Sequence, residues 1–86
     1  MGYAKMELKE TVAMMTSDDC KERFKAEYYQ LVIRYKKLAE LLDKWDKNEF
    51  DFEPICPRST YNMQIDAMTD YLAVLEARAV MENIEL

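Results

Sequence analysis

The apolar residues of this chain fall into two long stretches with helical spacing. In each stretch, apolar or aromatic positions recur at alternating steps of four and three residues, which is typical of one helix packed along another. The positions in the first stretch are Phe24, Tyr28, Leu31, Tyr35, Leu38, Leu42 and Trp45. Those in the second are Tyr61, Ile65, Met68, Leu72, Leu75 and Ala79. We therefore predict two long helices, over residues 17–46 and 59–84, that pack together at a shallow angle.

Polar residues mark where both helices are expected to begin. Thr16 stands three residues before Asp19, and Asp19 stands three residues before Glu22. These overlapping capping signatures predict that the first helix starts between Thr16 and Asp19. Ser59 or Thr60, which follow the second proline of the chain, are the expected N-cap of the second helix.

The connection between the helices, residues 47–58, lacks a helical period. Phe50, Phe52 and Ile55 alternate there with acidic residues and a proline. This pattern predicts an extended loop, anchored by apolar side chains, whose aromatic residues fold back over the end of the helical pair.

The remaining segment, residues 1–16, mixes apolar and charged residues, and its spacing fits either a short amphipathic helix or a frayed arm. The chain of 86 residues has one glycine and two prolines, and half of its residues are apolar, which is typical of a helix-rich protein. We predict a single all-α domain, residues 1–86, built as a long antiparallel helical hairpin with an N-terminal helical arm. A domain of this size buries a small core, so we also expect a homo-oligomer.

Two apolar residues of the first helix fall outside the predicted contact with the second. Tyr29 and Ile33 lie away from that contact, with Lys36 and Glu40 as neighbours. A cover is expected for this pair, either from the N-terminal arm or from another subunit.

Charge and composition exclude several classes of protein. The net charge is −5 and the basic residues are interspersed among carboxylates, which argues against a protein that binds a nucleic acid polymer. No apolar run is long enough to cross a membrane, and the charged first fifteen residues are unlike a signal peptide, so a cytoplasmic protein is expected. The chain has no histidine, and Cys20 and Cys56 are expected to lie far apart as free thiols. We predict no bound metal and no cofactor.

The second helix carries a further apolar stripe about 100° around its axis from the first. The members of this stripe are Ala67, Val74 and Met81. Gln64, Tyr71 and Arg78 lie between the two stripes, where they are expected to face something other than bulk water. A buried polar group without a partner costs roughly 1–3 kcal/mol, so these three side chains need partners.

Two interpretations of these three residues stay open. In the first, Arg78 pairs with Glu22 or Glu27 of the first helix, while Tyr71 and Gln64 pack at a subunit boundary. In the second, helices of two subunits form a ligand pocket, in which Arg78 holds a phosphate and Tyr71 stacks on a base. A pocket that contains Arg78 favours ligand binding, whereas a flat apolar patch with Arg78 in an internal salt bridge favours a protein-interaction surface.

Three segments resemble known phage proteins. Residues 19–38, 52–57 and 64–78 are similar to a family of small proteins related to a crAss-like phage gene product, and the likeness covers residues 17–86. The last helix also resembles the helical part of a Thoeris anti-defence family, whose members sequester cyclic ADP-ribose signals in pockets between subunits. This second resemblance implies Tyr71 and Arg78 as pocket residues.

These observations lead to a functional hypothesis. We predict a phage anti-defence protein that binds and sequesters a cyclic nucleotide or cyclic ADP-ribose-type immune messenger without cleaving it, in the cytoplasm of the infected bacterial host. It is not expected to be an enzyme. Beside Tyr71 and Arg78, the expected ligand-binding residues are Gln64 for an edge of the base, and Arg34 and Arg58 as second cations.

The alternative belongs to another functional class. It is a small helical protein–protein interaction module that inhibits a host defence effector. Exposure of Tyr29 and Ile33 in the assembled oligomer would favour this alternative.

Overall fold

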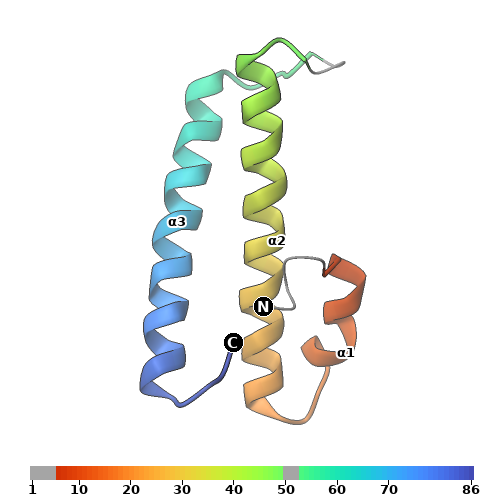
Figure 1. The fold of residues 1–86 in the computed structure, drawn as a ribbon, viewed down its shortest axis with the longest axis vertical. Helices are drawn as coiled ribbons and strands as arrows, with labels where there is room; N and C mark the ends of the chain where they lie inside the picture. The colour runs from red at the N-terminus through yellow and green to blue at the C-terminus, as the bar shows by residue number, and fades with distance from the viewer. Residues whose placement is uncertain (1–5, 50–52) are drawn as a thin grey trace.

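The computed structural model describes residues 6–49 and 53–86, and every regular element within them is a helix (Figure 1). This confirms the predicted all-α fold class. The elements in chain order are the 3-10 helix η2 (Leu8–Thr11) and the α-helices α1 (Val12–Met15), α2 (Cys20–Asp46) and α3 (Arg58–Met81).

Helices α2 and α3 run antiparallel, side by side along most of their length (Figure 1). The N-terminal segment, formed by η2 and α1, packs against α2 on the side away from α3. The molecule measures 43 × 24 × 22 Å, so it is a rod about as long as α2 itself.

Helix α2 begins where its sequence supplies a cap. The Asp19 carboxylate accepts a hydrogen bond from the Lys21 amide at 2.9 Å, and the Ser17 hydroxyl accepts one from the Asp19 amide at 3.0 Å. A side-chain oxygen at this position satisfies an amide that has no partner inside the helix. Asp19, the N-cap, is the last residue of the predicted window, and the helix itself begins one residue later, at Cys20.

Asparagines in the left-handed conformation end both long helices. Asn48 has φ = 57°, and the Glu49 amide donates to the Lys44 carbonyl at 2.8 Å. Asn83 has φ = 55°, and the amide of the next residue, Ile84, likewise donates a hydrogen bond to a carbonyl in the last turn of α3. This is the Schellman arrangement. It ends α3 at Met81, three residues before the predicted boundary.

The start of α3 differs from the prediction. Pro57, and not Ser59 or Thr60, occupies the N-cap position, and the helix begins at Arg58. Pro57 is extended there (φ −65°, ψ 155°), and its carbonyl accepts the Thr60 amide at 3.0 Å. The fixed φ of proline suits this position, so the cap forms without a side-chain acceptor.

Of the three apolar residues predicted to anchor the loop before α3, the described residues include only Ile55. Ile55 is fully exposed, so it does not anchor the loop. Phe50 and Phe52, which were expected to fold back over the hairpin, lie outside the described residues.

The best-buried part of the core lies where the start of α2 meets the end of α3. Leu75 is 1% exposed, and the Tyr28 hydroxyl in the same region donates to Glu76 of α3 at 2.8 Å. The buried members of this cluster are Phe24, Tyr28, Leu31, Val32, Leu75, Ala79 and Ile84. Ile84 reaches the cluster because the turn at Asn83 folds the chain back onto α2 and α3.

The N-terminal segment is fixed to α2 by a buried hydroxyl. Thr11 is 1% exposed, and its oxygen accepts from the Gln30 amide group at 3.0 Å while donating to the Leu8 carbonyl at 2.7 Å. Ile33, three residues after Gln30, is 5% exposed, and Tyr29 is half-buried. The N-terminal segment of the same chain therefore covers this side of α2. This is one of the two covers expected from the sequence, the other being a second subunit.

Candidate ligand-binding site

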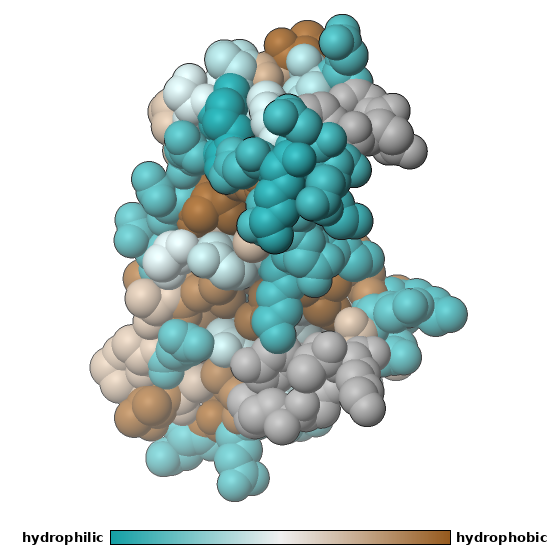
Figure 2. All heavy atoms as spheres, turned by 45° about the horizontal axis from the view of Figure 1, so that its top comes forward, coloured by the Kyte–Doolittle hydropathy of each residue, from teal (hydrophilic) through white to brown (hydrophobic). Residues whose placement is uncertain are grey.

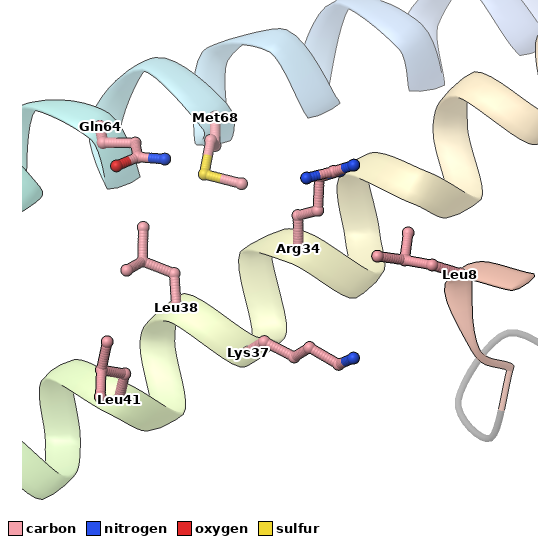
Figure 3. Close-up of a pocket in the computed structure, with 7 residues that line it drawn as sticks. All are labelled: Leu8, Arg34, Lys37, Leu38, Leu41, Gln64 and Met68. Carbon is pink, nitrogen blue, oxygen red and sulfur yellow. The ribbon is translucent and has the colours of Figure 1, made fainter. Parts of the chain in front are cut away.

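A groove runs between α2 and α3 near the middle of the hairpin and has a volume of about 360 Å³ (Figure 3). Small-molecule sites in proteins commonly have volumes of about 300–1,000 Å³. Helix α2 supplies four of the lining residues, α3 supplies two, and η2 supplies one. They are Arg34, Lys37, Leu38 and Leu41 of α2, Gln64 and Met68 of α3, and Leu8 of η2.

The groove combines apolar side chains with two cations. Leu38, Leu41 and Met68 form an apolar surface, and Arg34 and Lys37 lie three residues apart on α2. The Arg34 guanidinium rises from α2 toward α3, and the Gln64 amide points along the groove toward Met68 (Figure 3). This combination suits a small ligand that carries both an anionic group and an apolar or aromatic surface.

The two cations of the groove have no charged partner within residues 6–49 and 53–86. Neither Arg34 nor Lys37 makes an ion pair or a side-chain hydrogen bond with a described residue. Like charges three residues apart on one helix repel each other slightly. A bound anion would relieve that repulsion, although the chain as a whole carries a net charge of −5.

The groove brings together two of the five predicted ligand-binding residues. Gln64 and Arg34 both line it, and they come from different helices. Tyr71 is 44% exposed and lies on the side of α3 that no other described element covers. Tyr71, Arg78 and Arg58 are not among the residues that line the groove.

Arg78 is paired within its own helix. Its Nε lies 2.9 Å from the Glu82 carboxylate, and its guanidinium carbon lies 4.8 Å from the centre of the Phe24 ring. The predicted partners, Glu22 and Glu27 of α2, do not make this salt bridge, because Glu82 stands one helical turn away on the same face. The hydrogen bond from Arg78 to Glu82 raises the pKa of Arg78, and the charge of Glu27 acts in the same direction.

Arg58 lies at the opposite end of the hairpin from Arg78. Its Nε is 3.3 Å from the Asp46 carboxylate, and its guanidinium lies 5.9 Å from the Trp45 ring centre. It also donates a hydrogen bond to Asn62, one turn later in α3. These contacts join the end of α2 to the start of α3, which is a structural role.

Sequence analysis missed the remaining lining residues of the groove. Lys37 could have been found, because it follows Arg34 at a helical step on one face of the first predicted helix. Leu8 gave no such signal, since its contact with the groove depends on where the N-terminal segment docks.

Three further findings concern the described part of the chain. Within it, no three His, Cys, Asp or Glu side chains are grouped so that they could hold a metal ion. None of the helices described there is both long and apolar enough to cross a membrane. Cys20 and Cys56 are exposed free thiols, as predicted.

Comparison with known proteins identifies a family. The Sequestin family model matches residues 18–81, which include all of α2 and α3 but not the N-terminal segment. The search of curated proteins found no match, and neither did the search of solved structures. Since the family model covers well over half of the chain, this protein belongs to the Sequestin family.

Proposed function

We propose that this protein captures a cyclic nucleotide immune messenger, such as a cyclic ADP-ribose isomer or a cyclic oligonucleotide, and holds it without cleaving it. The observation that carries the proposal is the groove between α2 and α3, where Arg34 and Lys37 lie beside an apolar surface and have no charged partner among the described residues. The family name, Sequestin, suggests sequestration and so agrees with capture of a small ligand.

In this proposal each part of the groove binds a different part of the nucleotide. Arg34 donates two hydrogen bonds to a phosphate from its planar guanidinium, and Lys37 adds a second charge. The base packs against Leu38 and Met68, and the Gln64 amide donates to and accepts from a polar edge of the base. Binding energy then comes from charge neutralisation and from apolar burial together.

Capture without turnover agrees with the groove's chemistry. The side chains that line it are aliphatic, thioether, amide, guanidinium and ammonium groups. General acid–base and nucleophilic catalysis usually employ a histidine, carboxylate, thiol, hydroxyl or lysine amine, and among the described lining residues only Lys37 is of these types, where this proposal gives it the role of a fixed charge. We therefore propose a binding protein and not an enzyme.

We also propose where this protein acts and how it assembles. The protein would be encoded by a phage, act in the cytoplasm of the infected bacterium, and assemble as a homo-oligomer. Tyr71 lies seven residues after Gln64, on the same stripe of α3 and about 10 Å along the helix. In an oligomer, Tyr71 and Arg78 would supply a stacking face and a further cation beside the groove.

One observation favours the alternative, a helical module that inhibits a defence effector by direct contact. Arg78 is salt-bridged to Glu82 on an exposed, largely apolar side of α3, which is the arrangement expected of an interaction surface. The other expected sign, an exposed Ile33, is absent because Ile33 is buried. Arg34 and Lys37 of the groove have no role in this alternative.

A thermal-shift screen tests the proposed function. The panel contains cyclic ADP-ribose isomers, cyclic dinucleotides and cyclic trinucleotides, with linear nucleotides and inorganic phosphate as controls. A ligand at about 100 times its dissociation constant adds roughly 2.7 kcal/mol to the free energy of unfolding, which raises the midpoint of a domain of this size by roughly 10–20 °C. We expect a selective shift with one cyclic class. Equal midpoints with every compound would contradict nucleotide capture.

A further inference from the structure

The N-terminal segment reaches the groove through one side chain. Leu8 of η2 lines the groove together with Arg34 and Lys37, and in Figure 3 its side chain points toward α2. Leu8 is half-buried, whereas its neighbours Lys9 and Glu10 are exposed. The segment lies outside residues 18–81, so this wall of the groove is not part of the region that the family model matches.

Two hydrogen bonds in series hold Leu8 in this place. The amide group of Gln30 in α2 donates to the Thr11 hydroxyl at 3.0 Å, and that hydroxyl donates to the Leu8 carbonyl at 2.7 Å. Gln30, Arg34 and Lys37 follow one another at steps of four and three residues, so they lie on one face of α2. The segment therefore docks on the face of α2 that carries the two cations.

The docking point lies beside the cations and not beside the far end of the groove. Gln30 stands one helical turn before Arg34, and about 16 Å along α2 before Leu41, the last lining residue of that helix. Arg34 and Lys37 thus occupy the end of the groove that is nearer to the docked segment. We call this the cation end.

The largest exposed apolar surface of the molecule lies elsewhere. It gathers over the C-terminal half of α3, at the lower left of Figure 2. Val74 and Met81, which are exposed there, do not line the groove. Among the described lining residues, Leu8 is the one that comes from outside the pair of long helices.

We propose that η2 places Leu8 as an apolar wall at the cation end of the groove, where it keeps water away from a phosphate held by Arg34 and Lys37. This inference rests on the proposed function, because it concerns the same groove. Charge-assisted hydrogen bonds are stronger where water is excluded, since the effective dielectric constant is lower and dissolved ions screen the charges less. Leu8 then contributes to affinity without making a polar contact.

Leu8→Ala tests the wall, with inorganic pyrophosphate as the anionic probe. The full chain is titrated with pyrophosphate while the side-chain Nε–H signal of Arg34 is followed by NMR. We expect the dissociation constant of Leu8→Ala to be about three- to tenfold higher than that of the wild type. It should also rise more steeply with added NaCl, because the bound phosphate is more open to screening. Leu8→Met keeps the apolar volume and should bind within about twofold of the wild type.

Thr11→Val tests whether docking places the wall. Valine has nearly the shape of threonine but lacks the hydroxyl that joins Gln30 to the Leu8 carbonyl, so this variant should bind pyrophosphate about as weakly as Leu8→Ala does. Val12→Ala is the matched control, because Val12 is the next residue, is 51% exposed and does not line the groove. It should bind as the wild type does. Circular dichroism verifies that each variant keeps its helical content.

The outcomes separate this inference from the proposed function. Equal affinities for the wild type, Leu8→Ala and Val12→Ala would overturn the wall and leave the phosphate site at Arg34 and Lys37 intact. A Thr11→Val variant that binds as the wild type does would overturn the role of docking. A wild type that does not bind pyrophosphate at all would overturn the wall and the phosphate site together.

Discussion

Leu75→Ala is expected to lower the free energy of unfolding by about 2–5 kcal/mol. Leu75 is 1% exposed and lies in the cluster where the start of α2 meets the end of α3, so its truncation leaves a cavity that helical neighbours cannot easily fill. Small domains have a total stability of about 5–15 kcal/mol, so this one change removes a large share of it. Urea denaturation followed by circular dichroism, at one fixed protein concentration, measures the loss.

The control for this prediction lies on the opposite side of the same helix. Val80 is 79% exposed, so Val80→Ala should change the free energy of unfolding by no more than about 0.5 kcal/mol. If Leu75→Ala and Val80→Ala unfolded at the same urea concentration, the position assigned to the core would be wrong.

The second large effect concerns ligand affinity. The double variant Arg34→Ala/Lys37→Ala should bind the nucleotide selected by the thermal-shift screen at least about 100-fold more weakly than the wild type. A hydrogen bond to a charged group contributes about 1.5–3 kcal/mol, and each 1.4 kcal/mol corresponds to a tenfold change in affinity. Isothermal titration calorimetry measures the difference, and the free energy of unfolding should change little because both side chains are exposed and make no ion pair with a described residue.

Two variants separate a specific phosphate contact from a general effect of charge. Lys44 lies seven residues after Lys37 on the same side of α2 and does not line the groove, so Lys44→Ala should bind as the wild type does. Arg34→Lys keeps the charge but loses the planar pair of donors, so its affinity should fall between wild type and alanine. Equal affinities for the double variant and Lys44→Ala would exclude the groove as the phosphate site.

Much of the fold follows from the spacing of apolar residues. The steps of four and three predicted two long helices, and Leu75 and Ala79, at the end of the second series, are buried in the contact with α2. The start of α2 was predictable because Asp19 is a strong cap. The end of α3 was not, because it depends on the left-handed conformation of Asn83, which asparagine adopts in some contexts only.

The candidate site was only partly predictable for a different reason. Helical spacing shows which residues share a face, and it places Gln64, Tyr71 and Arg78 on one stripe of α3. It does not show which neighbours from another element come near that face. The groove therefore joins Gln64 to Arg34 of α2, while Arg78 takes a partner from its own helix. These contacts depend on the packing between elements.

Recovery of the bound nucleotide is the measurement that tests sequestration most directly. The protein is incubated with the selected messenger, freed of unbound ligand by gel filtration and then denatured by heat, after which the released small molecules are identified by mass spectrometry. We predict that the messenger is retained through gel filtration and released chemically intact, in an amount that scales with the protein. Release of a hydrolysed product, or a protein fraction that carries no nucleotide, would contradict capture without cleavage.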